Sequence, residues 1–271
     1  MDLSELQRAL AERGSPWVAQ RTPLLDMDPT KRRAVGIPES DAVDALRAAS
    51  SNLVSSWPSK TKIIETVDWR VSRPALLGPV RDQLTCNSCA AFAVCSVMEA
   101  QLRSREQACL DLSEADLFFC GGGDRGSGML LETALMRAKS HGVALEKHFP
   151  YDPAISECLA VNPAARLSGF QYITNERDRR LAISEDGPVI AVLRVYEDLI
   201  AYTSGVYEHI SGAYEGLHAV AIVGYDEAER FWIARNSWGP GAGEGGYFRI
   251  RYGQCEIDTR PFVAVDSESV A

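Results

Sequence analysis

The sequence predicts an α+β fold of two lobes, in which a mainly helical half precedes a mainly β half. The stretch that follows Cys89 and the stretch "LLETALMRAKSHG", which ends at Gly142, both predict helices. From Pro188 onward, apolar runs of strand length dominate: "PVIAVLRV", "HAVAIVGYD", "FWIARNSW" and "GYFRIRY". Because 46% of the 271 residues are hydrophobic, the chain can bury the core that such a fold needs.

The composition excludes several classes of protein. The net charge is −9, the pI is near 5.1, and no basic block is longer than Lys31–Arg33, so we expect no nucleic-acid partner. The first residues, "MDLSELQRALAERG", lack an apolar signal-peptide core, and no stretch approaches the roughly 18 apolar residues of a membrane span. We therefore expect no Sec signal and no membrane insertion, and either a cytoplasmic location or export by a non-Sec route.

Residues 1–62 are predicted to form an extension that precedes the main body. Ser4 and Gln7 have the spacing of a capping box, and Gly14 is placed to end the first helix. A second helix is predicted from about Ser40 to Ala49. The chain between the two helices is rich in proline and predicted to be irregular, and "SSNLVSSWPSK" has the composition of a linker.

The main body is predicted to span residues 63–271. Residues 63–165 are expected to form the mainly helical lobe and residues 166–271 the mainly β lobe.

The segment "QLTCNSCAAF" places Cys86 and Cys89 in a C-x-x-C arrangement, which serves a zinc site, a redox dithiol or a nucleophile beside a second thiol. Structural zinc needs clustered pairs of ligands, whereas the other cysteines are scattered singly. A redox dithiol follows a strand, whereas "RPALLGPVRDQLT" contains two prolines and little alternation, so this interpretation is weak but open. A cysteine nucleophile needs a base and a third group that orients the base.

His218 lies in "GLHAVAIVGYD", at the predicted start of a buried strand, and Asn236 is polar among apolar residues in "WIARNSW". They follow Cys89 by 129 and 147 residues, close to the offsets of about 130–150 that are typical of papain and the cathepsins. The chain resembles the papain-like cysteine peptidases from about Glu65 to Val265. The matching blocks are, in order, "VDWRVSRPALLGPVRDQ", "QLTCNSCAAF", "LSEADLFFC", "FPYDPAISEC", "HAVAIVGYD" and "NSWGPGAGEGGYFRI".

This resemblance implies a papain-like fold, with a helical lobe, a β-barrel-like lobe and an active-site cleft between them. Cys89 is expected to begin the central helix, where the helix dipole favours a thiolate, and to form an ion pair with His218. Asn236 would orient the imidazole, and Trp238 would shield that hydrogen bond from water. Gln83 and the Cys89 backbone N–H would donate to the oxyanion.

The sequence departs from the family pattern around the cleft. Ala90 follows the nucleophile where tryptophan is usual, Asn87 replaces a glycine, and Ala242 stands where a second aromatic residue is usual. We therefore expect a cleft that is wider or filled from elsewhere. The paired glycines that flank a substrate backbone correspond here to Gly128 and Met129.

The resemblance also implies a disulfide between Cys120 and Cys158. The residue that would pair with Cys86 is not a cysteine here. We expect Cys86 to be a free thiol, unless it pairs with Cys109 or Cys255.

Family specificity depends largely on the pocket for the second residue before the cleaved bond, called the S2 pocket below. Arg260 maps to its floor, where it either pairs with an acidic substrate side chain or pairs with Asp258 or Glu256 on an exposed loop. The residues that map to its walls are Leu130, Leu131, Val192, Gly216 and Ala219.

The sequence thus predicts a cysteine endopeptidase that acts on protein or peptide substrates through an acyl-enzyme thioester, with no metal or cofactor. We expect a monomer made as a zymogen, whose N-terminal extension is an intramolecular inhibitor or else a module that docks partners. The alternatives are a transamidase or amidase that uses the same residues, and a non-catalytic peptide-binding relative.

Overall fold

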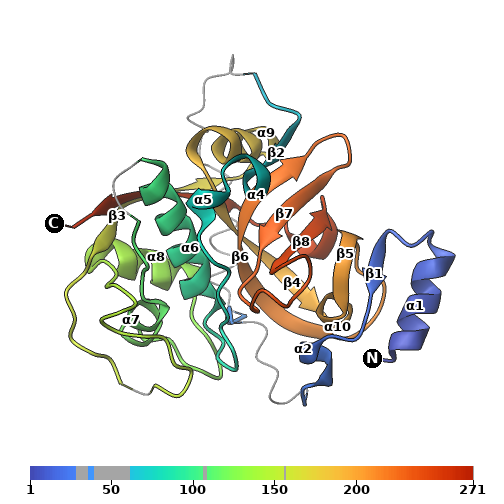
Figure 1. Ribbon diagram of the computed structural model, residues 1–271, viewed down its shortest axis with the longest axis horizontal. Coiled ribbons are helices and arrows are strands. Elements are labelled where there is room, and N and C mark those ends of the chain that lie inside the picture. Colours follow the sequence, from blue (N-terminus) through green and yellow to red (C-terminus); the bar gives the residue numbers. More distant parts are fainter. Residues whose placement is uncertain (29–35, 40–61, 106–108, 156, 271) are drawn as a thin grey trace.

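The computed structural model describes residues 1–28, 36–39, 62–105, 109–155 and 157–270. It confirms the predicted α+β class, with a helical lobe beside a lobe built on a large sheet (Figure 1). The predicted helix at Ser40–Ala49 and the predicted linker lie outside the described residues.

Among the described residues, the helices cluster in the first half of the body, as predicted. The helix after Cys89 is apolar on nearly every face, which explains why almost all of its residues are buried between the lobes. The helix that ends before Gly142 is also present, and Gly142 adopts the left-handed conformation (φ 79°). The α-helices are α1 (Leu3–Glu12), α2 (Pro23–Asp26), α4 (Trp69–Ser72), α5 (Pro74–Leu77), α6 (Cys89–Ser104), α7 (Glu114–Phe119), α8 (Leu131–Ser140), α9 (Glu176–Leu181) and α10 (Glu197–Ile200).

The strands of the described residues form one sheet in the order β1-β5-β8-β7-β6-β4-β9-β3, and β2 pairs with β6 outside this order. All four strands predicted after Pro188 are present. His218 was expected at a strand start; this is wrong, because β6 begins at Tyr214 and His218 lies inside it, opposite Leu193 of β4. The strands are β1 (Trp17–Ala19), β2 (Thr66–Asp68), β3 (Ala165–Ile173), β4 (Val189–Tyr196), β5 (Tyr202–Tyr207), β6 (Tyr214–Asp226), β7 (Phe231–Arg235), β8 (Tyr247–Arg251) and β9 (Phe262–Ser269).

The two lobes share part of one sheet. The β3–β9 end packs behind α6 and α8, so buried residues of β4, β6 and β9 belong to the same apolar cluster as those of the helical lobe (Figure 1). A second apolar cluster fills the β lobe. Because β6 contributes to both clusters, its central residues are fixed from both sides.

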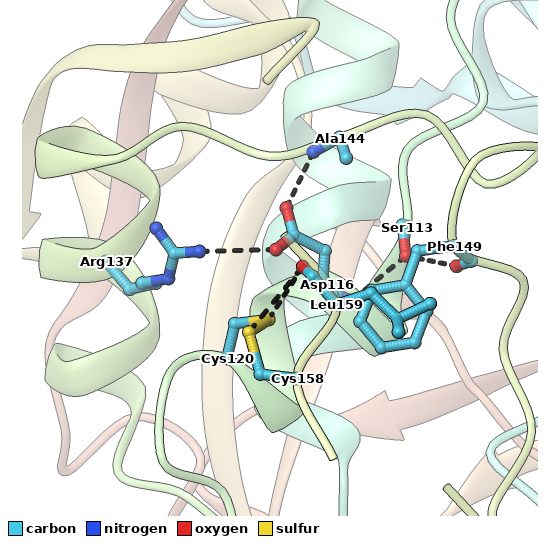
Figure 2. The surroundings of a disulfide bond; sticks show 8 residues. All are labelled: Ser113, Asp116, Cys120, Arg137, Ala144, Phe149, Cys158 and Leu159. Carbon is cyan, nitrogen blue, oxygen red and sulfur yellow. Dashed lines mark hydrogen bonds and ion pairs between the residues drawn. A yellow bond between two sulfur atoms is a disulfide. The ribbon is translucent and has the colours of Figure 1, made fainter. Parts of the chain in front are cut away.

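A disulfide between Cys120 and Cys158 joins the end of α7 to a later loop of the helical lobe (Figure 2). Beside it, the buried Asp116 accepts hydrogen bonds from the Ala144 backbone and from Arg137. Ser113 caps α7 by accepting from the Asp116 backbone N–H. These contacts hold the loops of the lobe around α6.

The N-terminal extension is built into the sheet of the β lobe. The structure corrects the capping box predicted at Ser4, because α1 begins at Leu3 and is capped by the side chain of Asp2. Strand β1 pairs with β5, and the buried Trp17 donates its indole N–H to the Glu208 carbonyl over 2.8 Å. The hydroxyl of Thr22 donates to the Ile200 carbonyl over 2.7 Å. The extension therefore contributes buried apolar side chains to the core of the β lobe.

Candidate active site

Cys89 is the first residue of α6 and is fully buried. Its sulfur accepts a hydrogen bond from the Ala219 backbone N–H at 3.4 Å, so the nucleophile candidate contacts the residue next to His218. Helix α6 belongs to one lobe and strand β6 to the other. The predicted nucleophile and base thus meet where the two lobes join.

His218, Asn236 and Trp238 form a buried group beside this thiol. The Asn236 side-chain oxygen lies 2.8 Å from His218 Nε2, and it also accepts from the Ser237 backbone N–H. The Trp238 ring covers the imidazole, with 5.1 Å between ring centroids. Among the described residues, His218 Nδ1 has no hydrogen-bond partner.

Gln83 is fully buried in the loop before α6 and is held at both ends of its side chain. Its amide nitrogen donates to the Cys86 carbonyl over 2.9 Å, and its amide oxygen accepts from the Ser237 hydroxyl over 2.7 Å. The backbone of Gln83 also donates to the Ser237 carbonyl. The loops that carry Gln83 and Asn236 are therefore linked directly.

Burial sets the charge state of the two reactive groups. It raises the pKa of the Cys89 thiol to about 12, although backbone N–H groups of Ala219 and Ala90 favour the thiolate. Burial lowers the pKa of His218 to about 4, although the hydrogen bond to Asn236 favours the imidazolium. Burial thus disfavours both the thiolate and the imidazolium, and the resting ion pair expected from the resemblance stays a prediction.

A short piece of the N-terminal extension, residues 36–39, lies between the two lobes near the site and is the short blue segment at the centre of Figure 1. The Gly36 and Ile37 backbone N–H groups both donate to the Leu217 carbonyl, at 3.0 and 3.1 Å. Met129 donates its backbone N–H to the Gly36 carbonyl at 2.9 Å. The segment is thus bound through its backbone to both lobes.

Glycine is required on both sides of this contact. A Cβ atom on Gly36 would lie 2.2 Å from the Asn87 carbonyl oxygen, and a Cβ atom on Gly128 would lie 2.0 Å from the Gly36 carbonyl oxygen. No sequence pattern marks Gly36 or Ile37 as residues of the cleft. A glycine before an isoleucine in an irregular stretch carries no local signal that it crosses a cleft.

Some of the residues assigned to the S2 pocket share an apolar cluster with this segment. Ile37 is buried in the same apolar cluster as Met129, Val192 and Ala219, while Leu131 packs against that cluster from the start of α8. Leu130 and Gly216 are half-buried.

Arg260 pairs with Glu256 across 3.1 Å, which is one of the two arrangements expected from the sequence. The expected exposed loop is wrong, because the Arg260 side chain is 7% exposed. Glu256 also pairs with Arg194 at 2.9 Å, whereas Asp258 pairs with Arg179.

Cys86 is a free thiol and fully buried, and Cys109 and Cys255 are free as well. Within the described ranges, no group of three metal-binding side chains is arranged to hold an ion. A search of the same ranges finds no helix that is both apolar enough and long enough to cross a bilayer.

Two lobes that meet around a cysteine, a histidine and an asparagine place the chain in the class of cysteine peptidases. The model of the papain family cysteine protease matches residues 63–265. The chain belongs to the papain family of cysteine proteases.

The similar proteins agree with this assignment. A cathepsin L-like peptidase of Aedes aegypti is 32% identical over 219 residues, which are 74% of this chain and 64% of the relative. Ananain of Ananas comosus is 31% identical over 216 residues, 74% of this chain and 61% of ananain. The chain thus spans less than two thirds of the length of these two relatives.

Among solved structures, procathepsin B S9 of Trypanosoma congolense has a TM-score of 0.86 at 23% identity, with 99% of each chain covered. The proform of the ragweed cysteine protease Amb a 11 has a TM-score of 0.77 at 26% identity, covering 98% of this chain and 86% of the other. These similarities agree with the predicted papain-like fold.

Proposed function

We propose that the chain is a cysteine endopeptidase with Cys89 as nucleophile, His218 as base and Asn236 as orienting residue. The observation that carries the proposal is the hydrogen bond that His218 Nε2–H donates to the Asn236 side-chain oxygen. It leaves Nδ1 as the nitrogen available to the Cys89 thiol, whose sulfur already contacts the neighbouring Ala219.

The reaction follows from this arrangement. Nδ1 of His218 takes the proton of Cys89, and the thiolate attacks the substrate carbonyl carbon. Gln83 and the Cys89 backbone N–H donate to the resulting oxyanion, where one such donor contributes about 2.7–4 kcal/mol. The C–N bond then breaks as His218 returns the proton to the leaving amine. Water, activated by His218, hydrolyses the thioester and restores the thiol.

We also propose that residues 1–62 are an inhibitory extension and that residues 63–271 are the peptidase domain, with lobes that divide near residue 165. The backbone contacts of Gly36 and Ile37 support this role, because a substrate would need the same N–H and C=O groups of Leu217 and Met129. Burial also raises the pKa of Cys89 and lowers the pKa of His218, which disfavours the charged, reactive forms of both groups. Inhibition thus combines a physical block with loss of the reactive thiolate. A docking role for the extension would not explain these contacts in the cleft.

The proposed activity is tested with a thiol-directed epoxide peptide and with a peptide substrate offered together with an amine acceptor. We expect labelling of Cys89 and release of a free carboxylate product, because water is the proposed acceptor. Transfer of the acyl group to the amine as the main product would support the transamidase alternative. If Gly36→Val, which displaces the cleft segment, also bound peptide without labelling or turnover, the chain would instead be a non-catalytic relative.

We propose that the S2 pocket accepts bulky aliphatic side chains and excludes acidic ones. Ile37 already lies among its apolar residues, and the charge of Arg260 is engaged by Glu256. The acidic residue of the cleft segment, Glu39, accepts from the Tyr214 hydroxyl and pairs with Arg194, which also pairs with Glu256. The charge of Arg260 is therefore not available to a substrate side chain.

A substrate library varied only at the S2 position tests this preference. We expect the wild type to favour leucine or valine, and Glu256→Ala to gain about 10-fold on glutamate because Arg260 loses its partner. Glu268→Ala, which removes an exposed carboxylate on β9, is the matched control and should match the wild type. Efficient cleavage after an acidic S2 residue by the wild type would contradict the proposal.

A further inference from the structure

The hydroxyl group of Tyr151 connects the two segments that carry the proposed oxyanion donors. It donates to the Gln83 backbone carbonyl over 2.9 Å, and its oxygen lies 2.7 Å from the Ser88 hydroxyl. Because the single proton of the Tyr151 hydroxyl goes to the Gln83 carbonyl, the Ser88 hydroxyl donates to Tyr151. Ser88 directly precedes Cys89 in the chain. One phenolic oxygen thus contacts the residue of one donor and the neighbour of the other.

Ser88 occupies the N-cap position of α6, where a serine side chain usually accepts from a backbone N–H of the first helical turn. The fully buried Ser88 side chain makes no such bond in the described part of the chain. Its hydroxyl contacts Tyr151 and, at 3.5 Å, the Cys86 carbonyl. The first N–H groups of α6 are thus left to the Cys89 sulfur, whose thiolate form they favour.

Tyr151 is fixed by contacts outside the cleft. Its backbone N–H donates to Glu146 Oε1 over 2.7 Å, and its ring packs edge-on against Phe92, with 4.8 Å between ring centroids. Phe92 lies about one turn after Cys89 on α6. Burial raises the pKa of the Tyr151 hydroxyl, so this group stays protonated and remains a hydrogen-bond donor.

Gln83 is held from both lobes. In the β lobe, Ser237 donates its hydroxyl to the Gln83 amide oxygen over 2.7 Å, and its carbonyl accepts the Gln83 backbone N–H over 2.8 Å. In the helical lobe, Tyr151 and the Cys86 backbone N–H both donate to the Gln83 carbonyl. The position of the Gln83 amide relative to α6 therefore depends on the contacts in the helical lobe.

We propose that Tyr151 is a positioning residue for the oxyanion hole. Its hydroxyl holds Gln83 through the backbone carbonyl and the Ser88–Cys89 peptide through the Ser88 hydroxyl, and so sets the spacing of the two donors. The inference rests on the proposed peptidase function. Donors of this kind act at about 2.7–3.1 Å from the oxyanion, so a displaced donor slows the chemical step. Substrate binding is unaffected, because the charge develops only in the transition state.

Tyr151→Phe tests the proposal, because it removes the hydroxyl and keeps the ring. The parent is the full chain with Gly36→Val, in which the cleft segment is expected to be displaced, and rates are expressed per site titrated by the epoxide peptide. We expect kcat to fall about 10- to 100-fold while KM stays within about 2-fold. Tyr172→Phe is the matched control and should keep kcat, because its buried hydroxyl has no hydrogen-bond partner among the described residues.

Two reagents separate the oxyanion hole from the reactivity of the thiol. A peptide nitrile adds the Cys89 thiol across its C≡N bond: sulfur bonds to carbon, the proton passes to nitrogen, and this nitrogen lies where the oxyanion would lie. Iodoacetamide is attacked at a saturated carbon, so iodide leaves and no oxyanion forms. We expect Tyr151→Phe to raise the Kd of the nitrile about 10-fold or more and to leave the rate of alkylation unchanged. Equal losses with both reagents would show a general disturbance of the site and overturn the positioning role.

Ser88→Ala tests the route through Ser88. Because this residue acts through the Tyr151 hydroxyl, the double variant should be no less active than Tyr151→Phe alone. Losses that multiply, or a Tyr151→Phe chain as active as the Tyr172→Phe control, would overturn the positioning role while the peptidase function stands. A parent that neither hydrolyses peptide nor reacts with the nitrile or the epoxide would overturn the peptidase function, and the positioning role with it.

Discussion

Cys89→Ala is expected to abolish peptide hydrolysis, with a loss of about 10⁶-fold in kcat, because no other group supplies the nucleophile. Cys86→Ala is expected to retain most of the activity. Cys86 is a buried free thiol near Cys89, but the hydrogen-bonded histidine and asparagine lie on the side of Cys89. The comparison uses kcat/KM on one peptide substrate.

Circular dichroism and thermal unfolding of both variants provide the control, since each change removes one buried sulfur from the same cluster. Two folded variants with equal loss of activity would support the redox dithiol instead. Labelling by the epoxide peptide should follow activity, being absent in Cys89→Ala and present in Cys86→Ala.

Gly36→Val should activate the full chain. The new Cβ atom would lie 2.2 Å from the Asn87 carbonyl oxygen, which is backbone and cannot rotate away. Overpacking of this kind costs about 1–3 kcal/mol, which shifts the equilibrium toward an open cleft by roughly 5- to 150-fold. Initial rates of peptide hydrolysis by the intact chain measure the effect.

The same substitution should change how thiol alkylation depends on pH. In the covered wild type, the pKa of Cys89 is raised to about 12, so iodoacetamide should react with this thiol only as the pH rises toward that value. When the segment leaves, water removes the burial penalty and the pKa falls. Gly36→Val should therefore react several pH units lower than the wild type.

Gly169→Val is the matched control, because a Cβ atom on Gly169, in β3, meets no atom within 4 Å. It should leave both activity and alkylation unchanged. If Gly36→Val behaves like this control, the cleft segment does not restrain the enzyme, and the extension is better explained as a docking module.

The sequence alone predicted the elements whose patterns are long and local. The continuous apolar run of β6 predicts a strand that is buried on both faces. The apolar residues on nearly every face of α6 predict a helix that is buried inside the fold. The same patterns did not define the start of β6 at Tyr214, since its first residues are only half-buried or exposed.

The candidate site was predictable because its chemistry needs residue types in a fixed order. A thiol, an imidazole and an amide at the spacing of Cys89, His218 and Asn236 are readable without coordinates, and the family match to residues 63–265 agrees with that reading. The sequence did not show how deeply these three side chains are buried. The pKa shifts of Cys89 and His218 follow from burial by parts of the chain that are far apart in sequence.

Only the tertiary structure decided which distant segments contact each other. The sequence left the partner of Arg260 open between an acidic substrate side chain, Asp258 and Glu256, and in the folded chain Arg260 pairs with Glu256. Ala242 was an unexplained small residue until the surrounding walls showed a cavity. No local pattern marked Gly36, because the need for glycine comes from the Asn87 carbonyl, whose oxygen would lie 2.2 Å from a Cβ atom at position 36. Local periodicity and residue type thus determined the elements and the reactive groups, whereas long-range packing determined what covers, charges and surrounds them.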